Sequence, residues 1–214
     1  MPTPMPSAER AIAGTVKPYH RHALACTGTR DWPERLEDAE GLLGRMARDV
    51  RDHREGPPPI PKLTATDEPA RGTGVDLLVF PDAVRYVGVR ETSWPSVLED
   101  LTSEQPSGAF RREPLHGRWL FVCVHAARDE RCGRCGPPVL EALRRSCDEE
   151  ELADVTVRAT SHVGGHKYAG NVLVYPEGVW YGTVVPDDAA RIVRGHLRDG
   201  RLAEELHRGS MLTP

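Results

Sequence analysis

The sequence contains one segment twice, and this repeat limits how the chain can fold more than any other feature. Residues 77–89, LLVFPDAVRYVGV, align with residues 172–184, VLVYPEGVWYGTV, including the proline and acidic residue between two runs of β-forming residues. The earlier ALACTG aligns with FVCVHA at nearly the same offset, and this places Cys26 where the second copy has Cys123. A repeat at near-constant spacing indicates an internal duplication. We therefore predict two small α/β units of the same type.

The first half is predicted to form a strand at HALACTG, a helix, a connection, a hairpin at residues 75–89 and a second helix. Asp31 is expected to cap the first helix, with Pro33 in its first turn. Residues 54–74 are rich in proline and have no hydrophobic period, so we expect a loop or an extended connection there. No strand is predicted in that segment.

The second half is predicted to repeat this order. WLFVCVH and VTVRATS are expected strands, GPPVLEALRRSC an expected helix, and DDAARIVRGHLRDGRLAEEL a terminal helix or pair of helices. Cys132 is placed in the loop that enters the middle helix. The order in both halves is close to the thioredoxin-like pattern. We predict an α/β fold of two tandem thioredoxin-like units, with mixed sheets flanked by helices.

Three regions follow from this division. Residues 1–18 are polar and punctuated by proline, so we expect a mobile N-terminal arm that becomes ordered where GTVKPYH docks. Residues 19–110 are predicted to form a degenerate scaffold unit, because the histidine pair described below has no counterpart there. Residues 115–214 are predicted to form the unit that carries the functional site.

Charge and hydropathy exclude several function classes. The 28 Lys and Arg residues stand against 32 Asp and Glu residues, and the resulting formal charge of −4 argues against a surface that coats nucleic acid. No apolar run approaches the roughly 20 residues of a membrane helix, and the first residues lack an apolar signal core. We therefore expect a cytoplasmic protein that uses neither a membrane nor a nucleic acid. In that compartment its cysteines are expected to be ligands or reduced thiols.

Two cysteines and two histidines form a candidate ligand set. Cys123 ends an apolar strand, and Cys132 follows nine positions later. His162 and His166 bracket Val163 and two glycines, which let the backbone turn so that both imidazoles face one point. Thiolate sulfur and neutral imidazole together suit iron or zinc, and Rieske-type centres use this mixture. The four side chains therefore predict a metal site.

These residues also carry a family resemblance. CVHAARDERCGRCGPPVL, SHVGGHKYAGN, WYGTVVPDDA and a closing RGSM resemble the sucrase/ferredoxin-like proteins, and the resemblance extends from about Gly14 to Met211. Members of that family are thioredoxin-like ferredoxins. The resemblance implies a [2Fe-2S] cluster as cofactor, held by Cys123, Cys132, His162 and His166. It further implies an electron-transfer or redox-sensing protein with an unknown partner protein, a reductase or an acceptor, and we do not expect an enzyme.

Two alternatives stay open at this point. Cys132 and Cys135 form the C-x-x-C signature of thiol-disulfide oxidoreductases, in which a helix start lowers the pKa of the first thiol. No proline precedes the strand that would face such a dithiol, and HVGGHKYAGN stands there instead. The same four ligands could alternatively hold zinc in a closed tetrahedral site.

Several neighbouring residues are assigned supporting roles. His125 shares a strand face with Cys123, and we expect it to form a hydrogen bond near the centre rather than to be a ligand. Cys26 and Cys147 are assigned to packing, and Cys135 to a nearby thiol or substitute ligand. A charge pair between Arg128 and Asp129 is expected to hold the loop, and Lys167 and Tyr168 are expected to cover the site.

Overall fold

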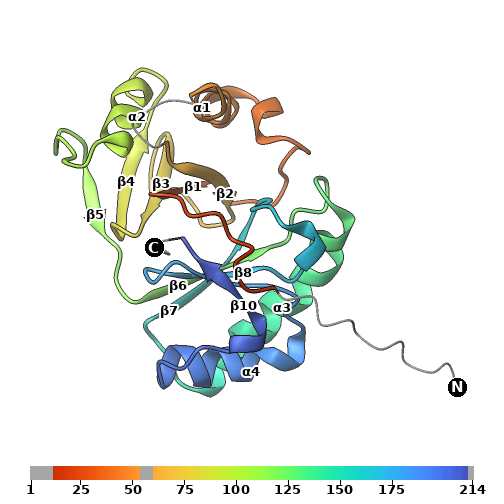
Figure 1. The fold of residues 1–214 in the computed structure, drawn as a ribbon. Helices are drawn as coiled ribbons and strands as arrows, with labels where there is room; N and C mark the ends of the chain where they lie inside the picture. Colours follow the sequence, from red (N-terminus) through yellow and green to blue (C-terminus); the bar gives the residue numbers. More distant parts are fainter. Residues whose placement is uncertain (1–11, 54–59, 212–214) are drawn as a thin grey trace, which may run out of the picture.

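The computed structural model describes residues 12–53 and 60–211. Within these residues, ten strands form one mixed sheet: β1 His22–Cys26, β2 Lys62–Thr66, β3 Val75–Phe80, β4 Val84–Val89, β5 Arg112–Pro114, β6 Arg118–Cys123, β7 Val155–Thr160, β8 Val172–Tyr175, β9 Val179–Tyr181 and β10 His207–Ser210. The longer helices are α1 Gly41–Asp52, α2 Trp94–Thr102, α3 Glu130–Glu149 and α4 Ala189–Arg191, which the π-helix η4 Ile192–Arg198 continues. Short 3-10 turns are η1 Leu36–Asp38, η2 His166–Tyr168, η3 Pro186–Asp188 and η5 Glu204–Leu206. The fold is α/β, as predicted (Figure 1).

The sheet consists of two halves with the same connectivity. The strand order is β10-β9-β8-β6-β7-β2-β1-β3-β4-β5. In one half β1 is parallel to β2 and antiparallel to β3, and β3 pairs with β4; in the other half β6 has the same relation to β7 and β8, and β8 pairs with β9. The hairpin turns both begin with a cis proline, at Phe80-Pro81 and Tyr175-Pro176. These are the two tandem thioredoxin-like units that the repeat predicts.

Both faces of the central strands are buried. Along β6, Leu120 and Val122 pack on one face against the hydrophobic cluster that contains residues of α3 and η4. Trp119, Phe121 and Cys123 point to the opposite face, as the period of two along a strand requires. The same alternation holds in the first unit, where Ala23 and Ala25 pack toward α1 and α2 while Leu24 and Cys26 point inward. Burial on both faces explains why these strands are continuous apolar runs.

The inward faces of the two units pack against each other in an inner layer. The Phe80 ring of β3 stacks on the Tyr175 ring of β8 with centroids 4.5 Å apart, and it meets the Phe121 ring of β6 edge-on at 5.9 Å. The Tyr175 hydroxyl lies 2.6 Å from His22 Nδ1 of β1 and 3.0 Å from the Tyr19 hydroxyl. Helices therefore cover the outside of each unit, and aromatic side chains fill the space between the units.

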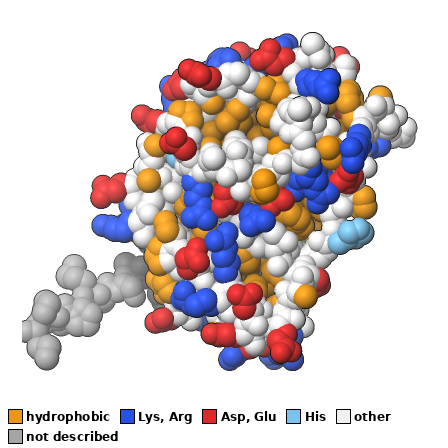
Figure 2. All heavy atoms as spheres, turned by 180° about the vertical axis from the view of Figure 1, so that it is seen from behind, with side chains coloured by type: hydrophobic (Ala, Val, Ile, Leu, Met, Phe, Trp, Pro, Cys, Tyr) orange, Lys and Arg blue, Asp and Glu red, His pale blue; other side chains and the backbone are white. Residues whose placement is uncertain are grey.

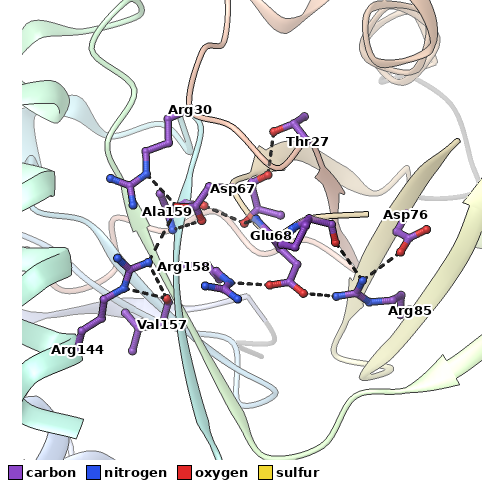
Figure 3. Close-up of polar contacts among 12 residues, drawn as sticks. Thr27, Arg30, Asp67, Glu68, Asp76, Arg85, Arg144, Val157, Arg158 and Ala159 are labelled. Atoms are coloured by element: carbon purple, nitrogen blue, oxygen red, sulfur yellow. Dashed lines mark hydrogen bonds and ion pairs between the residues drawn. The ribbon is translucent and has the colours of Figure 1, made fainter. Parts of the chain in front are cut away.

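Strands β2 and β7 join the two halves, and ion pairs strengthen the junction. The two strands pair at Thr66 and Thr160, and the Ala159 N–H donates to Asp67 Oδ1 over 2.8 Å. Figure 3 shows Glu68 between two guanidinium groups, with Arg85 of the first unit and Arg158 of the second each 2.5 Å from a carboxylate oxygen. Because the sheet runs through this junction, the proposed unit boundary between residues 110 and 115 stays a prediction.

The sequence-based assignment of residues 54–74 is wrong in part. Residues 54–59 lie outside the described residues, but Lys62–Thr66 form β2 in the middle of the sheet. This strand, KLTAT, shows little hydrophobic signal because Thr64 and Thr66, both buried, use their hydroxyls in hydrogen bonds to His22 and to the Ala159 carbonyl. Long-range hydrogen bonds hold this strand in the sheet, and the prediction relied on an apolar pattern that the strand does not have.

Helix boundaries also differ from the prediction. Helix α1 begins at Gly41 with Glu40 as its N-cap, so Asp31 is not the cap, and Leu36–Asp38 form a separate 3-10 turn. Helix α3 begins at Glu130, seven residues before Pro137, and therefore includes Cys132 in its first turn. Asp129 caps α3 by accepting the Arg131 N–H, a local signal that the emphasis on the two prolines obscured.

The chain ends differ from the prediction as well. The predicted terminal helix stops near Arg198, and the chain then forms η5 and the edge strand β10. Residues 1–11 of the expected mobile arm lie outside the described residues, while the docking of GTVKPYH corresponds to bonds from the Thr15 N–H to the Arg208 carbonyl, 3.0 Å, and from the Tyr19 N–H to the Met211 carbonyl, 3.1 Å. Among the described residues, no helix combines the length and the apolar character needed to cross a bilayer.

Candidate metal centre

Three of the four predicted ligands come from ends of neighbouring elements in the second unit. Cys123 is the last residue of β6, Cys132 lies in the first turn of α3, and His162 follows the end of β7 by two residues. Since β6 and β7 are parallel and adjacent, their carboxyl ends lie at one edge of the sheet. The helix start adds free backbone N–H groups that favour negative charge. The topology alone therefore brings two sulfurs and an imidazole to one point.

The ligand atoms of these three residues are close together. The sulfurs of Cys123 and Cys132 and a ring nitrogen of His162 all lie within 4.8 Å of one another. Cys132 Sγ is 3.8 Å from His162 Nδ1. Both cysteines are 1% exposed, and they belong to the inner-layer cluster with Phe121 and Val163. Two buried thiols that converge with a half-buried imidazole form a typical transition-metal site.

His166, the fourth predicted ligand, lies next to this group but outside it. Its ring is 5.9 Å from the His162 ring, with an interplanar angle of 27°, and its side chain is 51% exposed. His166 Nδ1 is 3.6 Å from Asp129 Oδ2. The structure therefore groups Cys123, Cys132 and His162 and leaves His166 between that group and the solvent.

The loop of residues 161–166, which we call the histidine loop, needs its glycines for two reasons. Gly164 and Gly165 have φ angles of +91° and +68°, which favour glycine. A Cβ atom on Gly165 would also lie 2.5 Å from Arg208 Nη2. The buried Arg208 donates to Asn171 Oδ1 over 2.5 Å, and Asn171 Nδ2 donates to the Gly165 carbonyl over 3.3 Å. Sequence reasoning missed both supports, although Arg208 opens the RGSM segment of the family resemblance.

The two thiols have opposite pKa shifts. Hydrogen bonding from the Cys132 thiol, together with contributions from His162 and the backbone N–H groups of Val163 and His125, lowers the pKa of Cys123 well below its usual value, against the effect of burial. The same pairing with Cys123, followed by burial, raises the pKa of Cys132. The two thiols therefore ionise as a pair, and the loss of the first proton disfavours the loss of the second. A bound cation would stabilise the second thiolate as well.

His125 is not available as a ligand, because both of its ring nitrogens have protein partners. Its Nδ1 accepts the backbone N–H of His162 at 3.1 Å. Its Nε2 lies 3.0 Å from the Pro33 carbonyl and 3.3 Å from the Trp32 carbonyl. The expectation of a hydrogen bond near the centre is thus confirmed.

The remaining cysteines are not part of the group of ligand atoms found among the described residues. Cys135 is partly exposed on α3, and the group of ligand atoms found in the described part of the chain does not include it. Cys26 and Cys147 lie in hydrophobic clusters, as predicted, and burial raises the pKa of Cys26 to about 12 and that of Cys147 to about 11. Those two thiols stay protonated at neutral pH.

The expected charge pair between Arg128 and Asp129 is wrong. Arg128 lies 3.5 Å from Glu34, across the gap between the units, while Asp129 pairs with Arg131 at 2.9 Å. The cap on α3 explains this, because the Asp129 side chain must face the helix start to accept the Arg131 N–H. Tyr168 is buried beneath Lys167, whose Nζ is 5.0 Å from the ring centroid. The covering role expected of the pair stays a prediction.

Charged side chains of both signs are exposed on the molecular surface. On the face seen in Figure 2, basic and acidic side chains are interspersed rather than gathered by sign.

Comparison with solved structures finds similar chains from Aquifex aeolicus. A thioredoxin-like [2Fe-2S] ferredoxin from Aquifex aeolicus is 27% identical, with a TM-score of 0.42 over 46% of this chain and 96% of that one. The wild-type form of the ferredoxin at 1.5 Å resolution is likewise 27% identical, with a TM-score of 0.41 over 44% of this chain and 99% of that one.

Among curated sequences, similar proteins are named Altered inheritance of mitochondria protein 32. The protein from Clavispora lusitaniae is 42% identical over 106 residues, which are 48% of this chain and 38% of the relative. That from Debaryomyces hansenii is 35% identical over 52% of this chain and 42% of its own. The Kluyveromyces lactis protein is 24% identical, with 94% and 78% covered. The first two alignments thus span well under half of the relatives' length.

The comparison with protein families covers much more of the chain. The family described as Sucrase/ferredoxin-like matches residues 12–209, which include both units, the Cys123 and Cys132 segment and the histidine loop. The protein therefore belongs to the sucrase/ferredoxin-like family.

Proposed function

We propose that this protein is an iron-sulfur protein that transfers electrons or senses redox state through a [2Fe-2S] cluster held by Cys123, Cys132, His162 and His166. The observation that carries the proposal is the convergence of three of these ligands within 4.8 Å, at a buried edge of the sheet. Such a cluster would supply storage of one electron at a potential raised by imidazole ligation.

The residues around the centre fit that role. The Val163 and His125 N–H groups contribute to the lowered pKa of Cys123, and hydrogen bonds to cluster sulfur ligands are one of the ways a protein tunes the potential. Phe121 and Val163 keep the cysteine side dry, since both belong to the inner-layer cluster. His166, at 51% exposure, lies where a partner protein would approach. In this proposal the cysteines face the core, and the histidines face the partner.

A structural zinc site is the second candidate, because one observation favours it. Three ligand atoms mutually within 4.8 Å also match the compact tetrahedral shell of a single ion, in which His166 would be the fourth ligand. A Cys132 and Cys135 dithiol is less well supported, because the Cys132 sulfur faces His162 Nδ1 at 3.8 Å and Cys123.

Metal and sulfide analysis of anaerobically purified protein tests these candidates together. We expect red-brown protein with about two iron and about two sulfide per chain. Colourless protein with stoichiometric zinc would replace the proposal by the structural zinc site. Metal-free protein with a reducible disulfide between Cys132 and Cys135 would support the dithiol instead.

A further inference from the structure

His125 links the histidine loop to the first unit. The backbone N–H of His162 donates to His125 Nδ1 over 3.1 Å. On the other side of the ring, Nε2 is within hydrogen-bonding distance of the Pro33 and Trp32 carbonyls, at 3.0 and 3.3 Å. Carbonyl oxygens only accept, so Nε2 carries the proton and Nδ1 is the acceptor. One imidazole thus joins a candidate ligand to a loop more than ninety residues earlier in the chain.

The first-unit side of this link is held firmly. The Trp32 ring meets the His125 ring edge-on at 5.7 Å, and Trp32 is 4% exposed. Trp32 Nε1 donates to Thr27 Oγ1 over 3.0 Å, and the Thr27 N–H donates to the Thr66 carbonyl at the end of β2 over 3.0 Å. The loop whose carbonyls accept the His125 hydrogen bond is therefore connected to the central sheet.

The histidine loop is bonded to the first unit at its start, where the Ser161 N–H donates to the Ala65 carbonyl over 2.8 Å and Ser161 Oγ accepts the Ala65 N–H over 2.9 Å. Beyond Ser161, next to His125, the loop borders open space. A cavity of about 390 Å³ lies there, with residues 34–37 on one side and residues 161–164 on the other. His125 forms part of the cavity wall. Space of that size would let the loop shift if the His125 bond were lost.

We propose that His125 is a positioning residue, which fixes the backbone at His162 relative to the first unit and so determines where the His162 imidazole stands. This role rests on the proposed function only in treating His162 as a ligand. It gives the first unit a direct part in the geometry of the centre. It also explains why a histidine two residues after Cys123 is not itself a ligand.

Two matched substitutions separate the two halves of the link. His125→Asn keeps an oxygen acceptor near the site of Nδ1 and removes the donor to the Pro33 carbonyl. His125→Gln keeps an amide donor near the site of Nε2 and removes the acceptor for the His162 N–H. A third variant, His196→Asn, is the control, since His196 is buried and bonds to the Tyr181 hydroxyl at 3.0 Å, away from the centre.

The measurements are the rate of metal release to a coloured chelator and, for iron-loaded protein, the electron paramagnetic resonance spectrum after reduction. We expect His125→Gln to release metal about tenfold faster and to shift the spectrum, because a buried N–H next to a ligand loses its acceptor. His125→Asn is expected to stay within about twofold of the wild type. His196→Asn is expected to lower only the melting temperature.

The outcomes distinguish this inference from the proposed function. Equal release rates for the Asn, Gln and wild-type proteins would overturn the positioning role, as would equal acceleration in both variants, which indicates a packing role alone. Chelator release can be followed with iron or zinc. Zinc in the wild-type protein would therefore refute the cluster but leave the positioning role testable, and a wild-type chain without any bound metal would refute both.

Discussion

The two units place a cysteine at the same point of the same fold but give it opposite chemistry. Cys26 ends β1 as Cys123 ends β6, and both side chains point into the inner layer. Burial raises the pKa of Cys26 to about 12, while hydrogen bonds lower the pKa of Cys123. The difference lies in the neighbours, because strand position alone does not activate a thiol.

The residues that follow the second strand of each unit explain the difference. His162 comes two residues after the end of β7, and Glu68 comes two residues after the end of β2. Where the second unit presents an imidazole to two sulfurs, the first presents a carboxylate to Arg85 and Arg158 (Figure 3). Asp76 completes the charge balance at 3.0 Å from Arg85, with both side chains 0% exposed. One copy brings two thiols and an imidazole together, and the other joins the units.

The largest expected effect tests this contrast at the cysteines. Cys123→Ser is expected to abolish the metal centre, because a hydroxyl replaces a soft thiolate poorly. Cys26→Ser, the matched change in the first unit, is expected to leave metal content and visible spectrum unchanged. Metal analysis of both variants checks this. Loss of metal in the Cys26 variant would show that the first unit supplies a ligand, and the contrast between the units would fail.

The next effect concerns the carboxylate that stands where the second unit has a histidine. Glu68→Gln is expected to lower the free energy of unfolding by about 3 kcal/mol, because it removes one partner of a buried ion pair and leaves Arg85 under-compensated. Urea unfolding measures the change. The control is Glu205→Gln, which breaks an exposed pair with Arg191 and is expected to cost less than about 1 kcal/mol. Equal losses in the two variants would argue against a joining role for Glu68.

A smaller loss is expected from the polar contact in the inner layer. Tyr175→Phe removes the hydroxyl between His22 and Tyr19, and we expect a loss of about 2 kcal/mol in unfolding free energy because a buried ring nitrogen of His22 loses its partner. Tyr181→Phe, which loses a comparable bond to His196 within the second unit, is the matched comparison. Urea unfolding measures both variants. A free energy of unfolding for Tyr175→Phe equal to that of the wild type would show that this contact between the units does not stabilise the fold.

The smallest effect is a pH dependence of the unfolding free energy that arises from His22. The second unit has Trp119 at the equivalent strand position. Burial, and then the charge of Lys62, lowers the pKa of His22 well below its ordinary value of 6.5. Between the folded and unfolded pKa values the unfolded chain binds more protons, so stability is lost as pH falls below about 6.5. From about pH 7.5 to about pH 5.5 this contribution falls by up to about 1.4 kcal/mol.

Urea unfolding of His22→Gln at both pH values checks this contribution. The variant is expected to lose correspondingly less stability than the wild type on acidification. Some dependence should persist, since burial also lowers the pKa of His125 and of His196. If the variant lost as much stability on acidification as the wild type, a group other than His22 would be responsible for the pH dependence.

Sequence reasoning succeeded where the determining pattern was local. The repeated hairpin with its proline and acidic residue predicted two units of one type, and their strands match in order and direction. The spacing of Cys123 and Cys132 and the glycines beside His162 identified residues that the fold brings together. Such patterns can be read along the chain because strand alternation and glycine conformation depend on neighbouring residues.

Tertiary structure decided what depends on residues far apart in the chain. Strand β2 could not be predicted from KLTAT, because its buried threonines form hydrogen bonds with β1 and β7. Glu68 became a junction only through Arg158, ninety residues later, and His125 became a link only through Pro33, ninety-two residues earlier. His166 stands apart from the three grouped ligands, although its spacing from His162 suggested an equal role. Local sequence carries no record of these partners, since a buried polar group finds its hydrogen bonds only when the chain has closed around it.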